Sequence, residues 1–291
     1  MRCRSLVLIA ACFAIGLIGC SSTPTPSSAP TPAGPVTREF KIAAAVRMNF
    51  NKDGVPTKTV TNTDVRYDWK REHNEKVLAF RSLSIKMDVD GFPLVDSEMS
   101  RERVTRTVNG KMEEKKADDS PALKSLLQDS FGSPICKLEV DATGKELSRT
   151  VLAGPGAKGT ILNTGMIALA TFFHPPFRAD REEWQEVMAL SVSKGATKGT
   201  LTYTKVAGGT GQPQVNVRGT LSAEGIPDET FGGLADTTHV VSGTQTYDLD
   251  RKEWGVGKHE VTITLRHLRD GKEIGSANGT ATMTFEMLPE K

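Results

Sequence analysis

The chain has 291 residues and is almost neutral, with 37 Lys or Arg residues against 35 Asp or Glu residues. Two of the arginines lie in residues 1–19, which contain no acidic residue, so the rest of the chain carries the two charges in equal number. Because it lacks the broad basic surface that nucleic-acid binding requires, we exclude nucleic acid as a partner. Hydrophobic residues make up 37% of the chain, which is enough for a domain with a sizeable core.

Residues 1–19 have the pattern of a secretory signal peptide. A basic start precedes an uncharged apolar run from Leu6 to Ile18, which is shorter than the roughly 20 residues that span a bilayer. The run ends in Leu17-Ile18-Gly19-Cys20, which resembles the lipobox of bacterial lipoproteins. This resemblance implies cleavage before Cys20 and acylation of its sulfur, which would anchor the chain in a membrane. An ordinary secretory peptide with a chance cysteine is the alternative.

Residues 20–37 are rich in Ser, Thr and Pro and predict a disordered spacer between the anchor and a domain over residues 38–291. In lipoproteins of bacteria with two membranes, an aspartate after the acylated cysteine often causes retention at the inner membrane. Ser21 stands there, which favours the outer membrane. The domain contains a single cysteine, Cys136, so we expect no disulfide within it.

Alternation of apolar and polar residues predicts antiparallel strands over most of the domain. The even-numbered residues from Phe40 to Phe50 are apolar, and a third strand changes phase between Phe80 and Leu83, which predicts a bulge or a bend. We expect a mainly β fold: a strongly curved antiparallel sheet or half-barrel with one or two short helices packed on it. Further strands are predicted at 65–69, 135–140, 145–152, 184–192, 200–206, 215–222, 237–249, 258–268 and 274–287.

Two segments have helical patterns. Ser120 and Pro121 suit the start of a short helix that runs to Phe131. Residues 161–173 carry no charge, and their apolar residues lie on more than one side of the predicted helix. This second helix either fills the hollow of the curved sheet or acts as a movable lid over a cavity for an apolar ligand. The candidate lining residues are Leu162, Met166, Leu169, Phe172 and Phe173.

Three features are spread over the domain: the hairpin at 140–146, the segment from Pro175 to Trp184, and the hairpin at 247–250. Together they resemble a group of uncharacterised, exported bacterial β-rich domains that are often lipoproteins. The curved sheets of that group are similar to the open half-barrels of periplasmic lipoprotein carriers. The resemblance implies a fold, and it brings no catalytic residues with it.

The sequence predicts no catalytic, cofactor-binding or metal-binding residue. It has no GxSxG motif, and Cys136 alternates with apolar residues, as a buried structural thiol would. No histidine pair has zinc-binding spacing, and we expect His259 and His267 to be solvated. The acidic residues around 88–91 favour a hairpin turn over a calcium loop, and 111–119 favours an exposed loop.

These observations predict a non-enzymatic lipoprotein of the cell envelope that binds or carries a lipid or another apolar ligand. The membrane is then a partner through Cys20. Two alternatives remain open at this point: an envelope scaffold that binds other proteins, and a hydrolase with an unrecognised site.

Overall fold

The computed structural model describes residues 36–288 except 53, 73, 142–145, 153–169, 171, 193–194, 207–211, 229–232 and 252. The predicted signal peptide, Cys20 and most of the spacer lie outside the described residues. So do Leu162, Met166 and Leu169 of the predicted second helix. The first strand begins at Val36, two residues before the predicted start of the domain.

The fold is one antiparallel sheet of 14 strands that does not close on itself, which confirms the predicted curved β architecture. Twelve strands follow the order β6-β5-β4-β3-β2-β1-β14-β13-β12-β11-β10-β9, and β7 and β8 extend from one end of β3. The strands are β1 Val36–Lys52, β2 Val55–Glu72, β3 Glu75–Val89, β4 Val95–Ser100, β5 Arg103–Val108, β6 Lys111–Lys116, β7 Pro134–Val140, β8 Glu146–Val151, β9 Glu183–Val192, β10 Gly195–Lys205, β11 Gln214–Asp228, β12 Gly233–Asp248, β13 Glu253–Arg269 and β14 Lys272–Met287.

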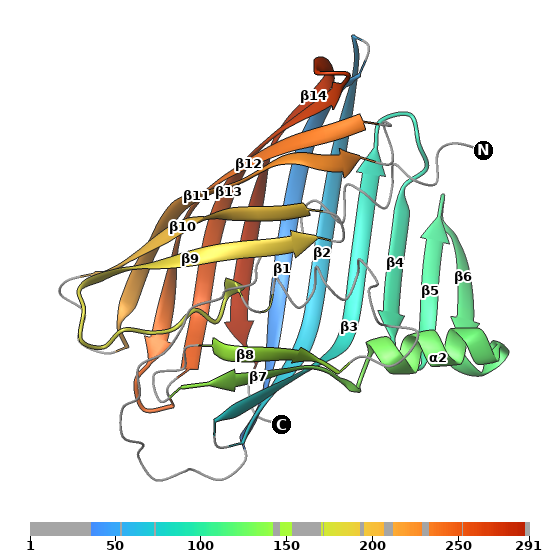
Figure 1. Cartoon of the computed structure of the whole chain (residues 1–291). Coiled ribbons are helices and arrows are strands. Elements are labelled where there is room, and N and C mark those ends of the chain that lie inside the picture. The colour runs from blue at the N-terminus through green and yellow to red at the C-terminus, as the bar shows by residue number, and fades with distance from the viewer. Residues whose placement is uncertain are drawn as a thin grey trace.

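The sheet is strongly curved, so that β9 and β10 pass in front of β13, β14 and β1 in Figure 1. One face is therefore concave, and we call it the inner face. Side chains alternate along each strand between this face and the outer face, as in the burial pattern of β13, where buried and exposed residues take turns. The inner side chains form one continuous hydrophobic core.

The predicted change of phase in the third strand is a β-bulge. Arg66 and Tyr67 of β2 pair with Ser82 and Phe80, so that Arg81 is the extra residue. The bulge lets Phe80 and Leu83 both point inward although they are an odd number of residues apart, and both are fully buried. Arg81 turns outward, where its Nε donates hydrogen bonds to both carboxylate oxygens of Asp68 at 2.8 Å.

Glycines on the inner face allow neighbouring strands to approach closely. A Cβ atom on Gly219 would lie 2.2 Å from the carbonyl oxygen of Thr200, and one on Gly279 would lie 2.2 Å from that of Arg47. The space next to Gly279 is taken by the sulfur of Met48 from the adjacent strand. Any side chain at these two positions would push the strands apart, so glycine permits the tight bend of the sheet.

The predicted helix after Ser120 is confirmed as α2, Pro121–Ser130, with the Ser120 hydroxyl accepting a hydrogen bond from the Leu123 N–H at 3.1 Å. Cys136 is buried in β7, as expected for a structural thiol. The prediction of a loop over 111–119 is wrong, because residues 111–116 form β6 and residues 117–119 a single 3₁₀ turn. Since every residue of β6 is exposed, this edge strand has no apolar alternation to reveal it.

Candidate ligand-binding face

The inner face of the sheet is lined mainly by apolar side chains. Strand register places them in rows that cross several strands. In one row, Val241 of β12 is opposite Val261 of β13, which is opposite Ala281 of β14, followed by Val46 of β1 and Thr61 of β2. All five residues are at most 3% exposed. The inner face is therefore a broad apolar layer with occasional polar groups, and its side chains are buried within the molecule. Among the described residues, the outward side chains that alternate with them are largely Thr and charged.

Residues 172–178, which we call the strap, run across one part of the inner face. Three side chains of the sheet hold it. The Gln245 side-chain amide donates to the carbonyl oxygen of Phe173 at 2.7 Å, and the Trp254 Nε1–H donates to that of Pro175 at 2.6 Å. The Tyr67 hydroxyl lies 3.1 Å from Nε2 of His174. Because these partners come from β2, β12 and β13, the strap joins distant strands of the curved sheet.

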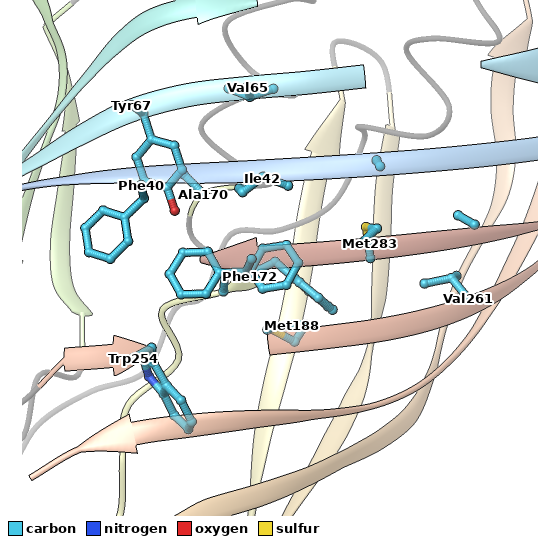
Figure 2. Packing of buried hydrophobic residues seen from close by; sticks show 14 of the residues in the cluster. Phe40, Ile42, Val65, Tyr67, Ala170, Phe172, Met188, Trp254, Val261 and Met283 are labelled. Carbon is cyan, nitrogen blue, oxygen red and sulfur yellow. The ribbon is translucent and has the colours of Figure 1, made fainter. Parts of the chain in front are cut away.

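The first two residues of the strap are part of the core. Phe173 stacks on Phe285 of β14 with 5.2 Å between ring centroids, and both Phe172 and Phe173 meet the ring of His259 edge-on at 5.1 Å. Figure 2 shows Phe172 among side chains from both wings of the sheet, including Met188 of β9. Phe172 and Phe173 are thus part of the core, while residues 161–169 and 171 of the predicted segment lie outside the described residues.

The other end of the strap is held by an aromatic cluster. Phe177 stacks on Tyr247 at 4.0 Å and meets Trp184 and Trp254 edge-on at 5.8 and 5.9 Å. The ammonium of Lys205 lies 5.7 Å from the centre of the Phe177 ring. The same ammonium donates a hydrogen bond to the carbonyl oxygen of Ala179 just beyond the strap. These contacts fix the strap against β9, β10, β12 and β13.

The predicted solvation of His259 and His267 is wrong. Their side chains are 1% and 3% exposed, and His239 of β12 is 4% exposed. The two histidines have the same odd numbering as Val261, Ile263 and Leu265 of β13, so the alternation of that strand places them on the inner face. Burial lowers the pKa of His239 and of His259 to about 4, which keeps both rings neutral at pH 7.

Several buried polar groups of the inner face have no hydrogen-bond partner within the described part of the chain. Both ring nitrogens of His239 and the hydroxyl of Thr237 are such groups on β12, and the hydroxyls of Thr61 and Thr63 are such groups on β2. A buried polar group without a partner costs about 1–3 kcal/mol of stability, which is why native proteins contain few of them. A ligand with hydrogen-bonding atoms would satisfy them.

The sequence alone did not single out this set of residues. Thr61 and Thr63 have the inward phase of Val65 on β2, but a threonine side chain does not itself indicate burial. The same holds for Thr237 on β12. His239 has the inward phase of Val241 on β12, which is a signal that alternation offers. Among the described residues, no three His, Cys, Asp or Glu side chains gather as metal ligands would, and no helix is long and apolar enough to cross a membrane.

No known protein family and no curated protein matches the chain in sequence. Among solved structures, it is similar to one described as lipid–protein interactions in lipovitellin, with a TM-score of 0.47 and 10% identity over 89% of this chain. The chain spans only 25% of that lipovitellin chain. It is also similar to a bacterial polysaccharide outer membrane secretin (TM-score 0.27, 7% identity, 87% of this chain and 99% of the other). Pseudomonas putida OprB at low pH gives a TM-score of 0.24 at 7% identity, over 87% of this chain and 92% of OprB.

Proposed function

We propose that the protein is a lipoprotein of the cell envelope that binds a lipid or another apolar molecule against the inner face of its sheet. The observation that carries this proposal is the composition of that face. It is a broad, buried apolar layer on an open sheet, and it contains polar groups without partners on both β2 and β12. An amphipathic ligand supplies what such a face needs, because its chain packs against the apolar rows and its polar atoms reach the histidine and threonine groups.

The strap supports the same proposal. Through Phe173 and Phe177 the strap covers the aromatic part of the inner face, and side chains from several strands hold it there. The unpartnered polar groups on β12 belong to His239 and Thr237, which lie in a different part of the face. They are opposite Ile263 and Leu265 of β13. The strap contacts β13 nearer its start, at Trp254 and His259. The strap thus leaves a stretch of the inner face whose polar groups it does not satisfy.

The second part of the proposal is the membrane anchor, which we place on Cys20. Acylation would hold the domain at a membrane on a spacer of residues 20–37, and Ser21 supports the outer membrane as its location. Several acyl chains, each contributing about 0.8 kcal/mol per buried CH₂, give lasting attachment where one chain gives only marginal binding.

Replacing the acylated cysteine tests the anchor. We expect Cys20→Ala to block both lipid attachment and cleavage, so that labelled palmitate is no longer incorporated and the chain keeps residues 1–19. Cys12→Ala is the matched control, because Cys12 lies in the apolar run of the signal and should leave labelling and cleavage unchanged. Equal labelling of the Cys20→Ala and unsubstituted chains would show that the anchor is elsewhere or absent.

Native mass spectrometry of the full chain, purified in a non-ionic detergent, tests the ligand. We expect an additional non-covalent mass of lipid size, beyond that of the covalent anchor, which collisional activation releases. Val241→Phe should reduce the adduct, because Val241 is 1% exposed and points inward. Val240→Phe is the control, since Val240 is 49% exposed on the outer face of the same strand. A chain that carries only the covalent anchor, with no adduct, would contradict the proposal.

A further inference from the structure

Cationic side chains gather at one end of the inner face, where β2 ends and β3 begins. Arg71 is opposite Lys76 in the register of these strands, and Lys76 is in turn opposite Leu138 of β7. Arg71 has the phase of Trp69 and the other inward residues of β2. It is half-buried, whereas Lys70 and Glu72 on either side of it are exposed. Both cations therefore belong to the rim of the inner face.

The nearest carboxylate, that of Glu253, is shared among several cations of this rim, because it interacts electrostatically with Arg38, Lys76 and Arg71. Glu253 of β13 pairs with Arg38 of β1 at 3.5 Å, with both side chains largely buried, and Asp248 pairs with Arg251 at 3.4 Å. Glu253 also acts on Arg71 and Lys76, but the ion pair that the structure gives it is the one with Arg38. Burial and the charge of Arg71 lower the pKa of Lys76 to about 8, although the charge of Glu253 acts in the opposite direction. Cations in excess of the carboxylate that they share cost stability at a half-buried position unless a further anion joins them.

The same rim adjoins the aromatic part of the inner face. Trp69 meets His174 of the strap edge-on with 5.3 Å between ring centroids. Lys76 is near enough that its charge, together with burial, lowers the pKa of His174 well below the usual value. At this rim the two cations, Arg71 and Lys76, therefore lie next to aromatic rings of the inner face. This is the arrangement that an amphiphile with an acidic headgroup requires, since its apolar chain and its charge must be bound at adjoining places.

We propose that Arg71 and Lys76 form a binding site for the anionic headgroup of an amphiphile, a carboxylate or a phosphate, whose apolar chain lies against the inner face. This inference rests on the proposed function and names the class of ligand. Arg71 offers a planar guanidinium that can bind two oxygens of the headgroup at once, and Lys76 adds a second charge beside it. The ligand would then add a second anion to a rim at which Arg38, Arg71 and Lys76 share the carboxylate of Glu253.

Two fluorescent probes that differ only in charge test the site. The full chain in a non-ionic detergent is titrated at pH 7 with cis-parinaric acid, which carries a carboxylate, and with its uncharged methyl ester. We expect the unsubstituted protein to bind the acid about tenfold more tightly than the ester, since a charge-assisted hydrogen bond has about that effect. In the double variant Arg71→Gln/Lys76→Gln, this preference should disappear and binding of the ester should remain.

The matched control is Arg66→Gln/Lys86→Gln, which removes one arginine and one lysine from the exposed outer side of the same two strands. It should leave the preference for the acid intact, and so should Lys76→Arg, which keeps the charge. Ester binding by each variant shows that the inner face is still folded. Equal binding of both probes by the unsubstituted protein, or an unchanged preference in the double variant, would overturn the headgroup site and leave the proposed function standing. Failure to bind either probe would overturn both.

Discussion

Phe173→Ala is expected to lower the free energy of unfolding by about 3–5 kcal/mol, the range found when a fully buried phenylalanine is truncated. The Phe173 side chain has no measurable exposure. It stacks on Phe285 and contacts the edge of His259, so its removal leaves a cavity between the strap and the sheet. Urea unfolding followed by tryptophan fluorescence measures the loss, because the tryptophans are themselves in or near this core.

Phe92→Ala is the matched control for this truncation. Phe92 is 43% exposed and lies beside Gly91 in the turn between β3 and β4. A surface substitution of this kind usually changes stability by no more than about 0.5 kcal/mol. If the two variants lost equal stability, the strap would not be packed into the core, and the second interpretation of residues 161–173, a movable lid, would regain support.

Acidification is expected to destabilise the protein through its buried histidines. The pKa of His239 and of His259 is about 4 in the folded chain, against an ordinary value of 6.5. Between these two values the unfolded chain binds more protons than the folded chain, so stability is complete above pH 6.5 and is lost as the pH falls towards 4. At 1.36 kcal/mol per pKa unit, each histidine accounts for roughly 3 kcal/mol of this loss.

The variants His239→Leu and His259→Leu separate this effect from the protonation of carboxylates. Each variant should lose less stability than the unsubstituted protein between pH 6.5 and 4, and the double variant least of all, in urea unfolding measured at a series of pH values. Leucine also removes a polar group that lacks a partner, so stability at pH 7 should not fall. Parallel pH profiles for all four proteins would contradict the burial of these neutral rings.

Much of the sheet could be predicted because its strands are long and bury the side chains of one face only. The alternation from Phe40 to Phe50 and the change of phase between Phe80 and Leu83 follow directly from which side chains must be buried. Strand β6 could not be predicted in this way, because all of its side chains are exposed and only its pairing with β5 makes it a strand. Alternation thus reports burial, and edge strands without a buried side escape it.

The candidate site was harder to predict than the fold. Phe172 and Phe173 stood out through their uncharged segment, and both are buried against the inner face. Arg71 and Lys76 are separated from Trp69 and Leu78 by only one residue each, but charges at strand ends are ordinarily solvated. The pairing of Arg71 with Lys76 is local, across the β2–β3 hairpin, but their place on the inner rim also depends on the pairing of β3 with β7, which joins Lys76 to Leu138 far along the chain. Local sequence patterns carry no record of that pairing.

The central claim is that a lipid lies against the inner face, and photo-methionine tests it most directly. This methionine analogue changes the side chain little and crosslinks on illumination to whatever it touches. Buried, inward-facing methionines are present on β1, β9 and β14, and Met112 of β6 is 69% exposed and serves as an internal control. These residues include Met48, Met188 and Met283, and Met87 of β3 is a fourth buried methionine.

The protein is grown with photo-methionine, purified in a non-ionic detergent, illuminated and digested, and its peptides are weighed by mass spectrometry. We expect lipid-sized additions on peptides that contain Met188 or Met283 and none on the peptide that contains Met112. Crosslinks from the inward methionines only to the protein's own chain, with lipid absent or found only on Met112, would show that the inner face is filled by protein and would contradict the account.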